Sequence, residues 1–468
     1  MGNEGGARMM SLSQAAFMLG VEHHNEDVTF TSVGADSRNI VPGRLFIALR
    51  GRHFDAHQYI PAAREAGAVA VIADDEGAAH VPADMPLIVV NNTRKALTQL
   101  AYGWRSRFTI PVVALTGSSG KTSVKEMLAS ILNEIAPGAV HATRGNLNND
   151  IGVPLTLLEL RDTHKIAVIE LGMNHAGEIS ALTQLTRPDI AVVNNAGRAH
   201  IENLGSEAAI ARAKGEIFEG MERLGQNGTA VINADDQYAE LWLKLSNKNK
   251  QLRFGLRNAD ISARYQLRAE ETQLTLLTPL GEAETTLHAP GLHNVRNALA
   301  ATAAAVALDV PLADIARGLA HYAGYKGRLQ KRLGIHGATL IDDTYNANPE
   351  SVHAAIDVLA RIPGERVLVL GDMGELGEHA GPAHRELGDH ARAVGIAKVY
   401  TLGQSSALTT EAFGAGATHY ADIEALVAGV SAELSPQTTV LVKGSRFMKM
   451  ERVIDALLEP AGHKRQKG

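Results

Sequence analysis

The feature that most constrains this chain is a glycine-rich turn, Thr116-Gly117-Ser118-Ser119-Gly120-Lys121-Thr122, between an apolar run at 110–115 and a helix-like stretch at 122–132. This order of strand, turn and helix suits a nucleotide phosphate, because backbone N–H groups of the turn and of the helix N-terminus point at the phosphate oxygens. Lys121 can reach the β and γ oxygens, and the Thr122 hydroxyl can ligate Mg²⁺. Leu115 stands where the full P-loop pattern has its first glycine, so the loop is a variant. The alternative is a Gly/Ser turn in an ordinary strand–helix unit, but the Gly-Lys-Thr ending favours a nucleoside triphosphate site.

The bulk properties of the chain exclude several classes of protein. A length of 468 residues predicts two to four domains. A net charge of −6 without a long lysine or arginine block argues against nucleic acid as a partner. The absence of cysteine excludes disulfides, thiolate metal sites and cysteine nucleophiles. Residues 1–8 lack the apolar segment of a signal peptide, and no run approaches the roughly 18 apolar residues of a membrane helix, so we expect a soluble cytoplasmic protein with no membrane insertion.

Hydrophobic patterns divide the chain into three α/β regions. Continuous apolar runs of four to six residues predict buried strands of parallel sheets, and helical stretches lie between them. The predicted strands are 44–49, 68–72 and 87–90 in the first region, 166–171, 191–194 and 229–233 in the second, and 339–342, 366–370, 398–402 and 439–443 in the third. A β-rich patch at 273–287 and an alanine-rich helix at 295–308 precede a linker at 324–328.

These patterns predict an α/β fold of three domains. We expect a small N-terminal α/β domain at 1–108, a central P-loop-type mononucleotide-binding sheet at 109–325 and a C-terminal Rossmann-like, doubly wound domain at 326–468. In doubly wound sheets the ligand crevice lies at the carboxyl ends of the strands. Polar residues at those ends are therefore candidates for function.

Polar side chains follow two of the predicted central strands. Glu170 ends one strand, while Asn194, Asn195 and His200 follow the next. In an open parallel sheet these side chains face the same crevice as the phosphate turn. Glu170 is either a second Mg²⁺ ligand or a solvated strand-end acid. His200 is either part of this site or a structural or exposed histidine, and both interpretations stay open.

Lys214 lies on the apolar stripe of a predicted helix. Ser206 is the expected N-cap, and Ile210, Lys214 and Phe218 follow at i, i+4 and i+8. One interpretation is a snorkelling lysine whose stem covers the edge of the core. The other is a lysine inside an active-site cleft, where desolvation favours the neutral amine that reacts with CO₂ to give a carbamate.

Further polar clusters occur before helices and after strands. Asn294 or Asn297 can contact an adenine edge or cap the alanine-rich helix. The segment 342–349 contains two acids and two asparagines that suit ribose hydroxyls or a substrate amine, or form an ordinary turn and N-cap. The glycine-rich segment 371–377 ends another strand, and Lys443-Gly444-Ser445-Arg446 adds two cations suited to a carboxylate.

Together these segments resemble the Mur ligase family in order and spacing over nearly the whole chain. The resemblance is carried by the phosphate turn, Glu170, His200, Lys214 and the segment 293–297. Four further segments favour the members that add D-alanyl-D-alanine to UDP-N-acetylmuramoyl-tripeptide: Asp36-Ser37-Arg38, Gly145-Asn146-Leu147-Asn148-Asn149, Glu170-Leu171-Gly172-Met173-Asn174-His175 and Asp343-Thr344-Tyr345-Asn346-Ala347-Asn348-Pro349.

The resemblance implies an ATP- and Mg²⁺-dependent ligase of peptidoglycan precursor synthesis, and through it a role in cell-wall biogenesis, cell shape and cell division. ATP phosphorylates the peptide carboxylate, and the amine of D-alanyl-D-alanine attacks the acyl phosphate, releasing ADP and phosphate. The resemblance further implies a cytoplasmic enzyme, which we expect to be a monomer. Closure of the third domain onto the second is expected to exclude water from the acyl phosphate.

The resemblance also implies roles for individual residues. Lys121, Glu170, His200 and Lys214 are the catalytic candidates; Thr122, Glu170, His200 and carbamylated Lys214 are the metal-site candidates. The ATP site comprises Thr116, Gly117, Ser118, Ser119, Gly120, Lys121, Thr122, Asn297, Arg328 and Asp343. The substrate site comprises Ser37 and Arg38 for the uridine nucleotide, Asn148 and Asn149 for the muramyl peptide, and Asn348, Lys443, Ser445 and Arg446 for the dipeptide.

Two other functions remain open. One is a related ligase that adds an amino acid, either a different Mur ligase or a folylpolyglutamate synthase, although a separate N-terminal domain with Asp36-Ser37-Arg38 disfavours the folate enzyme. The other is a non-catalytic binding protein with ATP as its switch. That interpretation is disfavoured by the joint presence of five site candidates: Lys121, Thr122, Glu170, His200 and Lys214.

Overall fold

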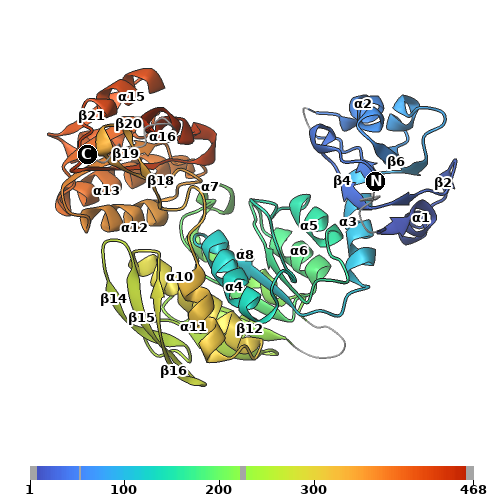
Figure 1. The fold of residues 1–468 in the computed structure, drawn as a ribbon, viewed down its shortest axis with the longest axis horizontal. Helices are drawn as coiled ribbons and strands as arrows, with labels where there is room; N and C mark the ends of the chain where they lie inside the picture. The colour runs from blue at the N-terminus through green and yellow to red at the C-terminus, as the bar shows by residue number, and fades with distance from the viewer. Residues whose placement is uncertain (1–7, 52–53, 222–227, 460–468) are drawn as a thin grey trace, which may run out of the picture.

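The computed structural model describes residues 8–51, 54–221 and 228–459, and it confirms the predicted α/β fold of three domains. The N-terminal and C-terminal domains lie on opposite sides of the central domain (Figure 1). Most of the N-terminal segment assessed for a signal peptide, residues 1–7, lies outside the described residues. Within the described residues, no helix combines the length and the apolar character that crossing a membrane requires.

The N-terminal domain is built on a five-stranded sheet of order β2-β7-β6-β5-β4, in which β2 runs antiparallel to β7 and the other pairs are parallel. Its elements are β1 (Met10–Ser11), α1 (Leu12–Leu19), β2 (His23–His24), β3 (Thr29–Phe30), β4 (Ser32–Gly34), β5 (Arg44–Ile47), α2 (Ile60–Glu65), β6 (Ala68–Asp74), β7 (Leu87–Val90) and α3 (Thr93–Arg105). The short strands β1 and β3 pair separately. The apolar strand β6 is largely buried, as its sequence predicts.

Buried polar contacts fix this domain to the central one. Arg105, at the end of α3, is fully buried and donates from Nε to the carbonyl oxygen of Thr186 at 2.9 Å. Trp104 donates from Nε1 to the carbonyl of Leu160 at 3.1 Å. Because a buried guanidinium without these acceptors is costly, the contacts hold α3 in one orientation.

The central domain has a six-stranded, all-parallel sheet of order β13-β12-β11-β8-β10-β9. The sheet elements and their helices are β8 (Val112–Thr116), α4 (Lys121–Ile135), β9 (Val140–Ala142), α5 (Gly152–Leu158), β10 (Ile166–Glu170), α6 (Glu178–Thr186), β11 (Ile190–Val193), α7 (Ile201–Leu204), α8 (Glu207–Gly215), β12 (Thr229–Asn233), α9 (Ala239–Leu245) and β13 (Lys250–Phe254). β8 lies between β10 and β11, so the chain reverses its direction of travel across the sheet there. Such a switch point opens a crevice at the strand ends.

A small antiparallel sheet and two helices complete the central domain. They are β14 (Ser262–Leu267), β15 (Thr272–Thr278), β16 (Gly281–Leu287), α10 (Leu292–Ala307) and α11 (Leu312–His321). The alanine-rich helix α10 is buried along most of its length, and α10 and α11 contact α4. Small side chains allow this close packing of helices over the sheet.

The third domain has a six-stranded sheet of order β17-β18-β22-β19-β20-β21, in which the edge strand β17 is antiparallel and the other pairs are parallel. Its elements are β17 (Gln330–Leu333), β18 (Thr339–Asp343), α12 (Pro349–Ala360), β19 (Glu365–Gly371), α13 (Ala380–Ala393), β20 (Lys398–Leu402), α14 (Ala407–Phe413), β21 (Ala417–Tyr420), α15 (Ile423–Ser431), β22 (Thr438–Lys443) and α16 (Glu451–Leu457). The loop after β18 reaches the central domain, where Asn348 Nδ2 donates to the Ser118 carbonyl, and Arg446 after β22 lines a cavity that central-domain residues also line.

Candidate active site

The phosphate turn connects β8 to α4, as the sequence predicts. Gly120 has φ 77°, a left-handed conformation that favours glycine. A Cβ atom there would lie 2.3 Å from Asn297 Oδ1, so a side chain is also excluded by space. Lys121 opens the helix, and its Nζ donates to the Gly117 carbonyl at 2.8 Å. The turn therefore folds over its own lysine and presents backbone N–H groups at the helix N-terminus.

Glu170, the last residue of β10, lies beside Thr122 in the first turn of α4. Thr122 Oγ1 donates to Glu170 Oε2 at 3.1 Å, and Asn148 Nδ2 donates to Glu170 Oε1 at 2.8 Å. Glu170 is only 2% exposed, which contradicts the alternative of a solvated strand-end acid. The neighbouring Asn149 instead accepts from the backbone N–H of Gly152 at 2.8 Å at the start of α5, a local structural contact.

Asparagines after β11 hold the other side of the turn. Asn195 Oδ1 accepts from the backbone N–H of Ser119 at 2.9 Å. Asn194 Nδ2 donates to the Ser119 carbonyl at 3.0 Å and to Asn297 Oδ1 at 3.1 Å. Asn297, on α10, thus lies against the phosphate turn within the described structure. These amide contacts fix the turn from the strand beside it.

Two lysines create an electrostatic conflict near the turn. Lys214 lies on α8 and is 1% exposed. Ser206 is the N-cap of this helix, as predicted, and its Oγ accepts a hydrogen bond from the backbone N–H of Ala209 at 3.2 Å. Burial lowers the pKa of Lys214 well below its usual value, and the charge of Lys121 lowers it further. Burial also lowers the pKa of Lys121. A lysine this deep does not snorkel to solvent, and its neutral amine is the form that can react with CO₂.

Two cavities meet at the phosphate turn. The first, of about 640 Å³, extends from Ser118–Gly120 toward α10, and its walls include Asn297, Arg328 and Asp343. The second, of about 830 Å³, extends from the same turn toward the N-terminal domain, and its walls include Lys121, Asn148, Asn149, Glu170 and His200. Residues 118–120 and Arg328 line both. The arrangement places two cavities on either side of one glycine-rich turn.

The residues at the junction fit a magnesium ion. In the described parts of the chain, no group of three or more histidine, aspartate and glutamate side chains is arranged to enclose a metal ion. Mg²⁺ is usually held by one or two protein oxygens together with water and phosphate oxygens, so a dedicated cage is not required. Thr122 and the buried carboxylate of Glu170 supply such oxygens. His200 lines the same cavity but contacts Glu375, since its Nδ1 lies 2.7 Å from Glu375 Oε2.

The third domain contributes Arg328, Asp343 and Lys443 to the cavity walls. The Arg328 guanidinium stacks on Tyr345, with its carbon 4.3 Å from the ring centre, and Nη2 lies 3.5 Å from Thr122 Oγ1. Lys443 is buried and contacts Asp343 Oδ2 at 2.6 Å. Its ammonium group is therefore held within the domain.

The remaining candidates of the third domain differ in exposure. Ser445 is buried and donates to the Ala347 carbonyl at 3.1 Å. Asn348 is the N-cap of α12, and its Nδ2 donates to the Ser118 carbonyl at 3.3 Å. Arg446 is exposed, pairs with Glu451 at 3.2 Å and lines the larger cavity. Asn348 and Arg446 thus reach the junction, whereas Ser445 supports the loop behind it.

The N-terminal candidates lie apart from the junction. Ser37 and Arg38 form a short 3₁₀ turn capped by Asp36, and Arg38 is 86% exposed and paired with Asp36 at 2.9 Å. Neither residue lines the two cavities. Arg94 on α3 lines the larger cavity, where its Nη2 donates to Asp150 at 2.8 Å. The sequence alone does not indicate Arg94, because an arginine on a helix surface carries no local signal of a contact with another domain.

Comparison with known proteins identifies the class that this fold and site define. Three family models match: the Mur ligase middle domain at residues 115–305, the Mur ligase glutamate ligase domain at 327–446 and the Mur ligase family catalytic domain at 29–105. The chain belongs to the Mur ligase family.

Individual relatives and solved structures within this family are similar to the chain over nearly its whole length. UDP-N-acetylmuramoyl-tripeptide–D-alanyl-D-alanine ligase of Escherichia coli K12 is 43% identical over 96% of this chain and 98% of the relative. A crystal structure of MurF from Acinetobacter baumannii has a TM-score of 0.88 at 34% identity and covers 96% of this chain and 98% of that one. MurF ligase from Thermotoga maritima in complex with ADP has a TM-score of 0.78 at 27% identity, over 91% and 96% of the two chains.

Proposed function

We propose that this protein joins D-alanyl-D-alanine to UDP-N-acetylmuramoyl-tripeptide by an ATP-dependent, ADP-forming reaction. The observation that carries the proposal is that both cavities end at the same phosphate turn, beside Thr122 and Glu170. A nucleotide in one cavity and a carboxylate in the other can then react at their point of contact. The Escherichia coli relative, whose name states this activity, supports the choice of substrates.

The reaction proceeds through transfer of the γ-phosphoryl group to the terminal carboxylate of the tripeptide. The backbone N–H groups of residues 117–122 and the ammonium group of Lys121 stabilise the charge on the transferring group. The amine then attacks the acyl phosphate, the C–N bond forms as the C–O bond to phosphate breaks, and the amine loses a proton. Mg²⁺, held by Thr122, Glu170, His200 and a carbamate on Lys214, would neutralise phosphoryl charge when bound.

The other assignments rest on position in the cavities or on the family resemblance. We assign the smaller cavity to ATP, with Asn297, Arg328 and Asp343 as contacts, and the larger one to the muramyl peptide, with Asn148 and Asn149. Ser37 and Arg38 are assigned to the uridine nucleotide, and Asn348, Lys443, Ser445 and Arg446 to the dipeptide or its loop. The domain boundaries 1–108, 109–325 and 326–468 are retained, and the protein is proposed to be a cytoplasmic monomer whose third domain closes over the substrates.

A coupled assay of ADP release tests the function. ATP, UDP-N-acetylmuramoyl-tripeptide and D-alanyl-D-alanine are each omitted in turn, and single amino acids replace the dipeptide in a parallel series. We expect ADP release only with all three present, and a loss of about 10²- to 10³-fold in Lys121→Ala, with exposed Lys244→Ala as the matched control. Turnover with a single amino acid would indicate a different ligase. ATP binding without turnover under every condition would indicate an ATP-switched binding protein.

A further inference from the structure

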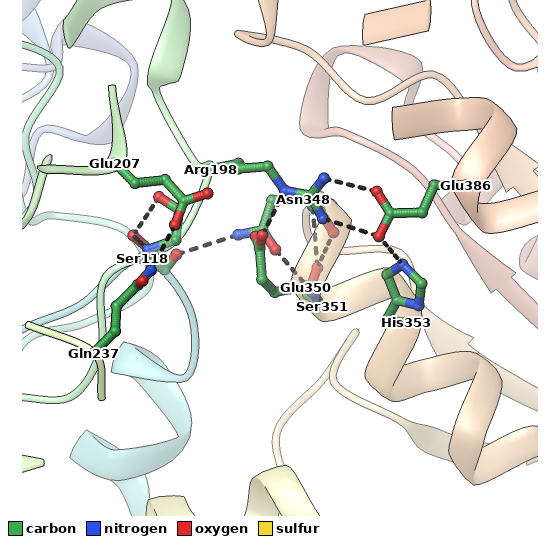
Figure 2. Close-up of polar contacts among 10 residues, drawn as sticks. Ser118, Arg198, Glu207, Gln237, Asn348, Glu350, Ser351, His353 and Glu386 are labelled. Carbon is green, nitrogen blue, oxygen red and sulfur yellow. Dashed lines mark hydrogen bonds and ion pairs between the residues drawn. The ribbon is translucent and has the colours of Figure 1, made fainter. Parts of the chain in front are cut away.

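Arg198 connects the central domain to two helices of the third. It lies in the loop between β11 and α7, and its guanidinium group reaches across the domain boundary. Nε donates to Glu350 Oε1 at 2.8 Å, and Nη1 donates to Glu386 Oε2 at 2.7 Å (Figure 2). Glu350 lies in the first turn of α12, and Glu386 lies on α13. His353 of α12 also contacts Glu386, with Nε2 2.9 Å from Oε1. One side chain thus holds two elements of the third domain.

The same loop is bonded to the phosphate turn. Gly197 N–H donates to Ser118 Oγ at 2.9 Å, and that hydroxyl donates to the Gly197 carbonyl at 3.2 Å. From the third domain, Asn348 Nδ2 reaches the Ser118 carbonyl, as Figure 2 shows. A Cβ atom at Gly197 would lie 3.1 Å from the carboxyl carbon of Glu350, so the loop backbone and α12 approach closely. Ser118 is therefore linked to the interdomain ion pairs through one residue.

The charges of Arg198, Glu350 and Glu386 stabilise the docked arrangement of the two domains over the separated one. Arg198 is 24% exposed, and although burial disfavours its charge, the hydrogen bonds with Glu386 and Glu350 hold its pKa above the usual value. Glu350 Oε2 is buried without a hydrogen-bond partner among the described residues, so the carboxylate depends on Arg198 for compensation. When the domains separate, water solvates these groups. Without Arg198, docking would bring two carboxylates to the interface with no counter-charge from this loop, which is unfavourable.

We propose that Arg198 is a positioning residue that couples docking of the third domain to the phosphate turn. Through Gly197 and Ser118, a nucleotide that orders the turn also orders the loop carrying Arg198, and the arginine then selects the docked domain. The effect on kcat/KM for the dipeptide rests on the proposed function, because that function assigns binding of the amine to the docked third domain. The docking itself requires only the protein and a nucleotide.

Fluorescence energy transfer measures docking directly. The chain has no cysteine, so Lys244→Cys on α9 and Glu424→Cys on α15, both exposed, give one labelled pair across the two domains. Transfer is recorded for the labelled parent, Arg198→Met and Arg198→Lys, each with and without the non-hydrolysable analogue AMPPNP. Arg361→Met, exposed at the end of α12, is the matched control, and thermal unfolding verifies that each variant is folded.

We expect Arg198→Met to lower the AMPPNP-dependent docked fraction and to reduce kcat/KM for D-alanyl-D-alanine about tenfold, with KM for the UDP-linked substrate changed less than about twofold. Arg198→Lys should be intermediate, since an ammonium group cannot address both carboxylates in the same fork geometry. Glu386→Gln should reduce docking in the parent but not further in Arg198→Met, because the two residues act as a pair.

Each result decides one of the two proposals. A docked fraction in Arg198→Met equal to that of the parent and of Arg361→Met overturns the positioning role, whatever the ligase assay gives. Loss of docking in Arg198→Met supports it even if the parent has no ligase activity, and that second finding would overturn only the proposed function. Should Arg198→Met fail to fold, Arg198→Lys and Glu386→Gln carry the same test.

Discussion

His200 of the central domain and Glu375 of the third domain contact each other across the domain boundary, with Nδ1 2.7 Å from Oε2. Both residues have left-handed backbones, with φ of 66° and 62°, which is uncommon for residues other than glycine. The contact with His200 lowers the pKa of Glu375, and the charge of Lys121 contributes. Two strained residues from different domains that meet beside Lys121 indicate that this arrangement is maintained by the surrounding structure.

The carboxylate of Glu170 is expected to set the magnesium requirement. Its two oxygens already accept hydrogen bonds from Thr122 and Asn148, which orient it toward the cavity. Glu170→Gln removes the negative charge but keeps the shape, so we expect the Mg²⁺ concentration for half-maximal ADP release to rise about tenfold or more. Exposed Glu240→Gln is the matched control. An unchanged magnesium titration in Glu170→Gln would remove this residue from the metal site.

Lys214 is expected to carry a carbamate. Because burial and the Lys121 charge lower its pKa, more of the amine is neutral near pH 7 than in an exposed lysine. Carbon-13 NMR of the protein in labelled bicarbonate should give a carbamate signal that is absent from Lys214→Met, with Lys244→Met retaining it. We also expect Lys214→Met to lower kcat about 10²- to 10³-fold. An identical spectrum for Lys214→Met and the parent contradicts the assignment.

The buried pair of Lys443 and Asp343 is expected to stabilise the third domain. Nζ lies 2.6 Å from Oδ2, and the two side chains are 2% and 8% exposed. Lys443→Met leaves an uncompensated carboxylate, so we expect a loss of about 3–5 kcal/mol in the free energy of unfolding. The double variant Lys443→Met/Asp343→Asn removes that charge and should recover much of the loss. Equal destabilisation of the single and double variants would show that the charge pairing is not the cause.

His141 on β9 is expected to make stability depend on pH. Its Nε2 donates to the Thr156 carbonyl at 2.7 Å, and burial lowers its pKa to about 4, from 6.5 in an exposed histidine. Below pH 6.5 the unfolded chain takes up the proton more readily than the folded one. This contribution to stability is therefore full above pH 6.5 and is lost between pH 6.5 and about 4, by up to about 1.4 kcal/mol per pH unit.

Tryptophan fluorescence offers a measurement of this effect. The chain has two tryptophans, Trp104 and Trp242, both in contact with the central domain, so urea unfolding followed by their emission reports on the region of His141. The parent should lose more stability between pH 7 and pH 5 than His141→Gln, which cannot take up the proton. Parallel pH profiles for the two proteins would exclude His141 as the titrating group.

Much of the fold follows from local sequence pattern. The apolar runs at 229–233 and 398–402 are strands with the predicted bounds, because continuous burial in a parallel sheet leaves a clear signal. The sequence does not predict the edge strand β17, Gln330–Leu333, because its mixed polar sequence lacks that signal. Pattern also does not reveal the contact of Lys443 with Asp343, because the two residues are 100 positions apart in the chain; the role of Lys443 in binding the dipeptide stays a prediction.

The sequence predicts those site residues whose position depends on the order of strands in the sheet. It does not predict those whose position depends on contacts between domains. Glu170 and Asn195 converge on the turn because β10 and β11 flank β8, as a switch point requires. Lys214 is buried because it lies on the apolar stripe of α8. Arg198 and Arg94 carry no such signal. Their partners are more than 50 residues away in the chain, and only the docking of domains brings them together.

The buried hydrogen bonds between α3 and the central domain bear on which length of peptide the protein is proposed to accept. Arg105 and Trp104 join the first domain to the central one through buried hydrogen bonds. Under the proposed assignment, a precursor bound in the first domain by its uridine end therefore starts from a set position relative to the glycine-rich turn. We therefore expect a stem peptide that is one residue shorter or longer to place its terminal carboxylate less well at Lys121. On this proposal the first domain selects the precursor by the length of its peptide.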